Sequence, residues 1–343
     1  MIRCDFIFPS DKTLHFGIVK NFDNSGAYPK FGLIDILKPL ENILNIDKVD
    51  YFFTYLHGSD QGNKGGNSII LKLFDAQNID PSNPDYNSPD LILKILKSKK
   101  NKYPSKGEKR FLKEIEAIDT CTQKRKQNII EIYHSGTCKI LNSKNSKLEE
   151  YAYYTMEPAD CDLKEYIENN HESLTELSKI SLCLSLAKGL EDLRSLGYYH
   201  RDIKPDNIFM IGNTWKIGDL GLIDERDTDL NIDKVNEFIG PRGWISPEAM
   251  NKFLCEKRGF KFDHNCNIDH QSDIFQLGKV FWYIFQHNAP IGTVKTTDFY
   301  YNNSQLFAVI KRMLNHNKKR RFHTIAEVIK DLKPLEFALS KVS

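Results

Sequence analysis

The sequence predicts an α+β fold of two lobes, the first rich in β-strands and the second mainly α-helical. In the first half of the chain, short apolar runs of strand length alternate with polar segments,. From about residue 174 onward, apolar residues recur mostly at helical spacing,. We expect an N-terminal extension of uncertain fold over residues 1–50, a strand-rich lobe over residues 51–157 and a helical lobe over residues 158–338.

Individual elements follow from local patterns. The run 91–96 (LILKIL) is typical of a buried strand, and residues 151–157 predict another,. Residues 174–196 predict a helix of about six turns,. A further helix is predicted over residues 109–118, with one apolar face made of Phe111, Leu112, Ile115 and Ile118. Three polar segments without a clear period are predicted to be insertions or linkers: residues 78–90, 139–150 and 253–271,.

The composition is that of an ordinary globular protein. Of the 343 residues, 40% are hydrophobic and 27% are charged, and the net charge of +2 demands neither a nucleic-acid partner nor an anionic membrane,. No stretch approaches the roughly 20 apolar residues that span a bilayer, and the first ten residues lack a signal-peptide core,. The seven scattered cysteines favour free thiols in a reducing compartment,. We therefore expect a cytoplasmic protein with no membrane partner.

Two short motifs carry the strongest functional signal. Residues 200–207 read HRDIKPDN, and residues 219–221 read DLG. Together they resemble the catalytic loop and metal-binding motif of the eukaryotic serine/threonine protein kinases, whose fold has the two lobes expected above. The resemblance implies that Asp202 accepts the substrate hydroxyl proton, Lys204 offsets phosphoryl charge, and Asn207 and Asp219 bind Mg²⁺. The adjacent Arg201 favours the protein-kinase branch and suggests control by phosphorylation of the activation loop.

A lysine–glutamate pair supports the resemblance. Lys94, in the predicted strand 91–96, resembles the lysine that holds the α- and β-phosphates of ATP in this family,. Glu114, twenty residues later in a predicted helix, resembles its ion-pair partner. Lys72 is a rival strand lysine, but it leaves no room for a phosphate loop and lies too far from Glu114 in the sequence.

The resemblance also implies a nucleotide site. Residues 62–70 resemble a glycine-rich phosphate loop, although Asn63 and Ser68 replace two of the family's glycines; a plain hairpin turn is the alternative,. Residues 154–160 resemble the strand and hinge behind the adenine, with Met156 as the gatekeeper and backbone groups of Glu157 and Ala159 facing the adenine edge. The expected nucleotide-binding residues are Asn63, Gly65, Gly66, Ser68, Ile70, Ile92, Lys94, Met156, Glu157, Ala159, Asp162 and Phe209, of which Asp162 is the candidate for the ribose.

Two further matches concern the fold. Glu248 resembles the family's buried glutamate, for which Arg321 is the expected partner and Arg320 the second choice. Asp273 resembles the aspartate that anchors the catalytic-loop backbone. The sequence departs from the family at Leu220, which replaces a Phe, and at Pro241, which replaces a hydroxyl-bearing Thr. Ile92 also replaces a small Ala above the adenine, which could crowd that pocket.

We therefore expect a protein kinase that transfers the γ-phosphoryl group of Mg-ATP to a Ser/Thr hydroxyl of a protein substrate. The alternative is a pseudokinase that acts as a nucleotide-binding scaffold or regulator, as the irregular phosphate loop suggests. Thr228 is the only hydroxyl-bearing side chain between residues 222 and 239 and is a hypothetical autophosphorylation site.

Two weaker patterns remain. Residues 15–34 faintly resemble the first strands of a cold-shock barrel, in which Phe22 and Phe31 would stack on single-stranded nucleic acid,. We favour a hairpin packed on the strand-rich lobe and do not expect a nucleic-acid partner. Cys255, Cys266, His264 and His270 fall close together, but their spacing fits no familiar zinc site, so we expect a loop without metal,.

Overall fold

The structure is a computed structural model that describes most of the chain. It covers residues 1–9, 17–20, 27–30, 42–56, 68–80, 82, 85, 87–142, 146–226, 233, 237–258 and 265–341, with the backbone alone at residues 17–20, 27–30, 55 and 258. The chain divides into two compact units. One comprises Met1–Asp119 and Glu131–Pro158, and the other comprises Thr120–Ile130 and Ala159–Ser343. The first is built mainly from strands and the second mainly from helices, which confirms the predicted α+β class.

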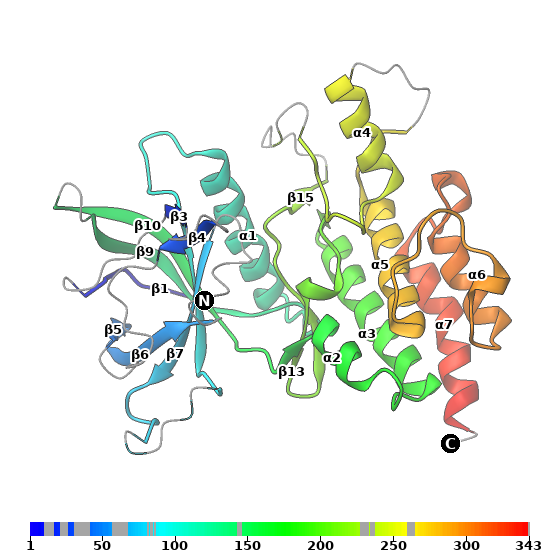
Figure 1. The fold of residues 1–343 in the computed structure, drawn as a ribbon, viewed down its shortest axis with the longest axis horizontal. Coiled ribbons are helices and arrows are strands. Elements are labelled where there is room, and N and C mark those ends of the chain that lie inside the picture. The colour runs from blue at the N-terminus through cyan, green and yellow to red at the C-terminus, as the bar shows by residue number, and fades with distance from the viewer. Residues whose placement is uncertain are drawn as a thin grey trace. The chain divides into compact units, whose positions relative to one another are not determined.

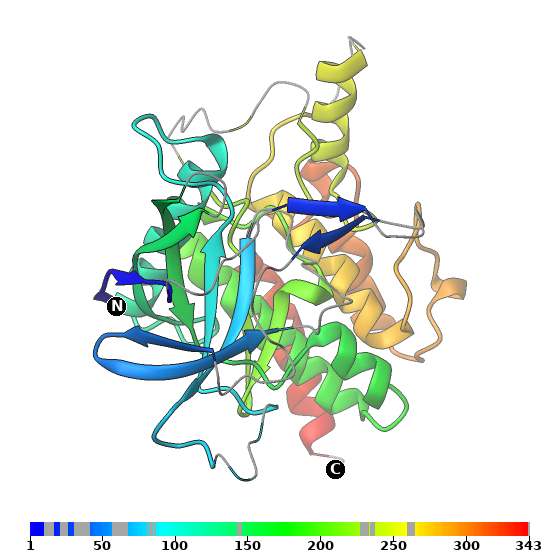
Figure 2. The same cartoon turned by 60° about the vertical axis from the view of Figure 1, so that its left-hand side comes forward.

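An eight-stranded sheet forms the first unit, in the order β1-β9-β10-β8-β7-β6-β5, with β2 also paired to β9. Figure 2 shows β5 and β6 as a hairpin at one edge of this sheet. The strands are β1 (Ile2–Arg3), β2 (Phe6–Ile7), β5 (Ile43–Ile46), β6 (Val49–Tyr55), β7 (Ser68–Asp75), β8 (Leu91–Leu96), β9 (Ile132–Asn142) and β10 (Lys147–Met156). Helix α1 (Lys106–Gln123) follows β8, and β3 (Gly17–Lys20) pairs with β4 (Ala27–Lys30) as a separate antiparallel hairpin.

Part of the first 50 residues belongs to the main sheet. Strands β1 and β2 pair in parallel with β9, and β5 pairs with β6, so this segment supplies three strands of the main sheet. The boundary that we expected at residue 50 instead falls inside β6. Sequence pattern could not reveal this, because strands of two to four residues are too short to show a period,.

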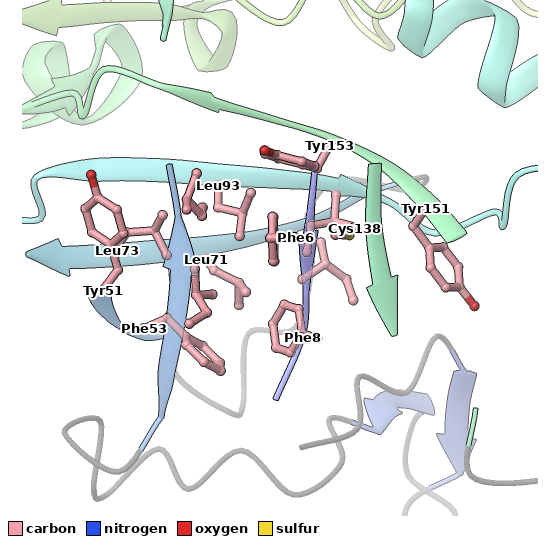
Figure 3. Packing of buried hydrophobic residues seen from close by; sticks show 14 of the residues in the cluster. Phe6, Phe8, Tyr51, Phe53, Leu71, Leu73, Leu93, Cys138, Tyr151 and Tyr153 are labelled. Atoms are coloured by element: carbon pink, nitrogen blue, oxygen red, sulfur yellow. The ribbon is translucent and has the colours of Figure 1, made fainter. Parts of the chain in front are cut away.

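The N-terminal segment completes the core of the sheet, as Figure 3 shows. Phe6 packs edge-on against Tyr153 at 4.7 Å between ring centroids, and Phe8 packs edge-on against Phe53 at 5.1 Å. Phe8 follows β2 and Phe53 lies on β6, so strands near the two ends of the sheet contribute to one core. The sheet is therefore curled. A close backbone approach accompanies this packing: a Cβ atom on Gly136 would lie 2.0 Å from the carbonyl oxygen of Cys4.

Two predictions about local structure in this unit need correction. Residues 139–150 are not a linker, because β9 and β10 pair as far as Asn142 and Lys147. Backbone hydrogen bonds sustain this hairpin where the side chains are polar and exposed. Leu112 also leaves the predicted apolar face of α1: it is 46% exposed, whereas Phe111, Ile115 and Ile118 are buried.

The second unit is a helical bundle with three small strand pairings. Helix α5 contacts α3, α4 and α6, and α3 runs beside α7 (Figure 1). The helices are α2 (Leu163–Asn170), α3 (Glu176–Ser195), α4 (Pro247–Arg258), α5 (His270–Gln286), α6 (Ser304–Met313) and α7 (Ile325–Ser340). The strands are β11 (Cys161–Asp162), β12 (Tyr198–Tyr199), β13 (Ile208–Ile211), β14 (Thr214–Ile217) and β15 (Asp224–Glu225). In place of the linker predicted over residues 253–271, α4 extends to Arg258 and α5 begins at His270.

Helix α5 is the central element of this unit. Fourteen of its residues are buried, which is typical of a helix enclosed on all sides,. Asp269 caps its first turn by accepting a hydrogen bond from the backbone of Gln271,. Gly278 allows α6 to approach closely, since a Cβ atom there would lie 2.7 Å from the Cβ of Met313. A rigid buried helix is a precise support for loops that bear functional side chains.

Within the described residues, none of the helices combines the length and apolar character that a membrane crossing requires.

Candidate active site

Three side chains of the helical unit meet on the loop that follows β12. The amide nitrogen of Asn207 donates to the backbone oxygen of Asp202 at 2.8 Å and to its carboxylate at 2.9 Å. The ammonium of Lys204 lies 3.5 Å from the same carboxylate oxygen. Asn207 is buried, whereas Asp202 is only partly covered. The structure therefore brings together the predicted residues Asp202, Lys204 and Asn207.

Helix α5 holds this loop by its backbone. The two carboxylate oxygens of Asp273 accept hydrogen bonds from the backbone nitrogens of His200 and Arg201 at 2.9 and 2.8 Å. One turn further along, Gln276 accepts from the nitrogen of Ile203 and donates to the oxygen of Arg201. These four bonds hold Arg201 at a φ of +67°, a conformation costly for a residue with a side chain,. The anchoring role predicted for Asp273 is confirmed.

The electrostatics of the loop suit proton transfer. Burial raises the pKa of Asp202 to about 6, the charge of Asp219 adds to the increase, and Lys204 and Asn207 oppose it. Burial lowers the pKa of His200 to about 4, so this imidazole is neutral at pH 7. Its Nε2 donates to the oxygen of Gly218 and its Nδ1 accepts from the backbone nitrogen of Asp202. Neutral His200 thus joins the two motifs without adding charge to the carboxylate.

The donor set near Asp219 fits a magnesium ion. The backbone nitrogen of Gly218 donates to the oxygen of Asn207 at 2.9 Å, which brings the second motif to the first. Because Asn207 uses its amide nitrogen on Asp202, its side-chain oxygen can serve as a metal ligand. Within the part of the chain that the structure describes, no three His, Cys, Asp or Glu side chains form a metal site. Two protein oxygens are what Mg²⁺ needs when water and phosphate complete its shell.

Arg201 has acidic partners that sequence reasoning missed. Its guanidinium contacts the carboxylate of Asp224 at 3.0 Å and that of Asp233 at 2.6 Å, and its Nε donates to the oxygen of Leu222. A second nitrogen reaches Asp233 at 3.3 Å, so that pair is bidentate,. The arginine is 4% exposed. The sequence offered one signal, the acidic residues in the segment after the DLG motif, but no spacing rule selects two of them.

The strand-rich unit contains the predicted lysine–glutamate pair. Lys94 on β8 lies 2.9 Å from one carboxylate oxygen of Glu114 on α1, and both side chains are almost fully buried. The hydroxyl of Tyr154 on β10 donates to the same carboxylate at 3.0 Å. Lys94 also lies above the Tyr154 ring, 5.5 Å from its centroid. Burial with two partners holds the lysine ammonium in one position.

Comparison with known proteins decides the family. The model of the protein kinase domain matches residues 87–335, which is most of the chain. The chain belongs to the protein kinase family. Similar kinases include the sensor for unfolded proteins in the ER ire1 of Schizosaccharomyces pombe, 28% identical over 46% of this chain, and human serine/threonine-protein kinase STK11, 29% identical over 50%. Human platelet-derived growth factor receptor alpha is 25% identical over 53%. The aligned segments span 16%, 37% and 17% of those three relatives.

Several of the expected nucleotide-binding residues share one face of the kinase sheet. Ile70, Lys94 and Tyr154 are direct cross-strand partners, so their side chains lie in one row,. Ile92 and Met156 are partners in the next row of the same face. Of the predicted phosphate loop, Ser68 begins β7 and is buried, whereas Asn63, Gly65 and Gly66 lie outside the described residues.

Two expected nucleotide residues have clear structural roles. Asp162 caps α2 by accepting a hydrogen bond from the nitrogen of Glu165 at 2.8 Å, so its carboxylate is partly used. The side chain of Glu157 accepts from the nitrogen of Glu131 at 2.7 Å. Phe209 pairs with Asp162 across β11 and β13. Ala159, directly after Pro158, is the first residue of the longer of the two segments that make up the helical unit.

The fold-supporting pair of the kinase domain is present in full. Arg321 and Glu248 form a buried bidentate ion pair with distances of 2.8 and 3.4 Å, and the hydroxyl of Ser272 donates to the same carboxylate. This pair involves Arg321, as expected, rather than Arg320. Leu220 is fully buried and therefore occupies a core position, as predicted for an apolar replacement.

Of the weaker patterns, residues 15–34 contain the antiparallel hairpin of β3 and β4, in keeping with the hairpin that we favoured there. The thiols of Cys255 and Cys266 lie 3.7 Å apart, and among the described residues they belong to no metal cluster. His264 lies outside the described residues, as do Phe22, Phe31 and Thr228.

Proposed function

We propose that the chain is an active kinase that transfers the γ-phosphoryl group of Mg-ATP to a Ser or Thr hydroxyl of a protein substrate. The observation that carries this proposal is the arrangement of Asp202, Lys204 and Asn207 around one partly buried carboxylate. Burial raises the pKa of this carboxylate to about 6, which suits a proton acceptor that works near neutral pH,.

The reaction follows from these positions. The carboxylate of Asp202 accepts the proton of the substrate hydroxyl while the hydroxyl oxygen bonds to the γ-phosphorus. The bond from that phosphorus to the β–γ bridging oxygen breaks. The ammonium of Lys204 offsets charge on the transferred group. Asn207 and Asp219 would hold Mg²⁺, whose charge offsets that of the triphosphate. Lys94, held by Glu114, would bind the α- and β-phosphates.

The choice of Ser or Thr as the acceptor has weaker support than the transfer reaction itself. Lys204 in the sequence HRDIKPDN is the serine/threonine form of the loop, which supports the assignment. Pro241, buried and without a hydroxyl, stands where kinases of this class carry a Thr. The acceptor is therefore best determined by analysis of the phosphorylated amino acid.

A direct assay tests the proposal. Purified protein with radiolabelled ATP, Mg²⁺ and a general protein substrate should incorporate phosphate on Ser or Thr, and Asp202→Ala should lose at least about a hundredfold in rate. Glu191→Ala, at a partly exposed position of α3 where the carboxylate pairs with Arg194, is the control and should keep full activity. Equal incorporation by Asp202→Ala would overturn the mechanism. Tight Mg-ATP binding without any transfer by the natural chain would favour the scaffold alternative.

A further inference from the structure

The helical unit contains a cavity of about 300 Å³ that none of the roles above uses. Its lining residues belong to the first turn of α4 and the residues just before it, one face of α5, and the segments that follow α5 and α6. Its apolar wall includes Ile245, Met250, Phe275 and Leu314. The size is at the lower end of ligand-binding pockets and suits one or two amino-acid side chains.

Each polar side chain of the wall can donate a hydrogen bond, and the amide nitrogen of Asn251 already donates to the oxygen of Asn265 at 3.2 Å. The wall includes Lys279, Asn251, His316 and Ser246, and none of the described lining residues is an Asp or Glu. The oxygen of Ser246 accepts from the nitrogen of Ala249 at 3.4 Å, which leaves its proton to donate. A half-enclosed site with donors and no carboxylate favours an anionic ligand.

Lys279 is the decisive residue of this wall. Its ammonium donates to the backbone oxygen of Gly243 at 2.6 Å, and among the described residues it makes no ion pair with a carboxylate. Burial lowers its pKa, and none of the carboxylates that the structure describes counteracts the shift. By contrast, Lys126 and Lys318 of the same unit pair with Asp192 and Asp269 at 3.0 and 2.8 Å. Lys279 is thus a partly buried cation to which an incoming carboxylate would supply an ion-pair partner,.

The cavity adjoins the catalytic loop through α5. Asp273, Gln276 and Lys279 follow one another at three-residue intervals, each about 4.5 Å along the helix,. The first two bind the backbone of residues 200–203, and the third binds Gly243. A Cβ atom on Gly240 would lie 3.4 Å from the oxygen of Arg201, so the segment that Lys279 holds packs directly on the catalytic loop. Ile245 and Ser246, which continue this segment, line the cavity.

We propose that the cavity binds an acidic side chain of the protein substrate, next to an apolar residue, and thereby selects substrates. The apolar residue packs on Phe275 and Met250, and the carboxylate pairs with Lys279. This inference rests on the proposed function, because it assigns the substrate of that same reaction.

A positional peptide library tests it. Serine peptides carry Leu-Asp, Leu-Glu or Leu-Gln at each position around the acceptor, and phosphate incorporation is compared with Mg-ATP and the full chain. At one position, the acidic pairs should exceed Leu-Gln by about tenfold, the effect of one charge-assisted hydrogen bond. Lys279→Arg should keep this preference, Lys279→Met should remove it, and Lys279→Glu should replace it with a preference for Lys or Arg.

A binding measurement separates failure of this inference from failure of the proposed function. The same peptides, immobilised without ATP, should retain the natural chain on the acidic pairs and retain Lys279→Met about equally on all pairs. If retention depends on Lys279 but no phosphate is transferred, peptide binding by the cavity is supported and only the proposed kinase activity is overturned. Identical peptide preferences for the natural chain and Lys279→Glu, in both assays, would overturn the inference.

Discussion

The guanidinium of Arg201 is bound by Asp233 through two nitrogen–oxygen contacts, 2.6 and 3.3 Å long. Asp224 supplies a second carboxylate at 3.0 Å. A phosphate group often fulfils this role in kinases, because it offers several oxygens to an arginine. Here two carboxylates already neutralise the cation beside Asp202. We therefore expect the geometry of the loop not to depend on a phosphate.

The first prediction concerns this pairing. Asp233→Ala should lower kcat by about tenfold, because Arg201 keeps only Asp224 and the adjacent Asp202 is less firmly positioned. Asp233→Glu should restore most of the rate. Phosphatase treatment of the natural chain should leave the rate unchanged, as measured by phosphate incorporation and checked by mass spectrometry at Thr228. A large loss on phosphatase treatment would show that phosphorylation, rather than Asp233, positions the loop.

The second prediction is a pH dependence. Burial raises the pKa of Asp202 to about 6, and this carboxylate must be ionised to accept a proton,. The rate kcat/KM should therefore fall about tenfold per pH unit below pH 6. The effect on stability has the opposite sign. Because the folded pKa exceeds the unfolded value of 3.8, the ionised group costs folding free energy as pH rises from about 4 to 6,.

A matched variant checks this reasoning. Asp202→Asn should abolish activity while the melting temperature is unchanged or higher, because a partly buried charge is removed. The gain should be largest above pH 6 and should vanish near pH 4. A rate that stays constant from pH 7 to pH 5 would contradict the assignment of Asp202 as the base.

The third prediction concerns the pair between Lys94 and Glu114. Lys94→Met leaves a glutamate with 1% exposure beside Tyr154, so the free energy of unfolding should drop by about 3–5 kcal/mol unless Glu114 takes up a proton,. Glu114→Gln keeps the shape and should cost less in stability while raising the KM for ATP. In a double-mutant cycle, the coupling between the two changes should be at least about 1 kcal/mol. Additive effects in urea unfolding would show that the pair is not coupled.

The fourth prediction tests the N-terminal strands. Phe8 is fully buried against Phe53, so Phe8→Ala should destabilise the fold by about 3–5 kcal/mol,. Gly136→Ala should also destabilise it, because its new methyl group would collide with the oxygen of Cys4. Ile7→Ala, at a 59% exposed position of β2, is the control and should change stability by less than about 0.5 kcal/mol,. Urea unfolding of the full chain measures all three, and a small loss for Phe8→Ala would show that the segment is not part of the core.

Local sequence determined much of this protein. Strand β8 is an apolar run interrupted by one lysine, Lys94, as the sequence pattern predicted. Helix α3 follows the predicted range within two residues at each end. Most of the residues that we expect to act on phosphate lie in two short motifs. A tight loop can bring side chains a few positions apart into contact without help from distant segments. Asp202 and Asn207, five positions apart, are such a case.

Tertiary structure decided what depends on contacts between distant segments. Strands β1 and β2 pair with β9, which lies about 130 positions later in the chain. Neither β1 nor β2 is long enough to show a pattern of its own. The choice of Asp233 for Arg201 arises from packing that no spacing rule records, and so does the lack of a described carboxylate beside Lys279. The physical reason is the same throughout: sequence period reports the local backbone, whereas burial and charge pairing depend on what the rest of the chain places beside each group.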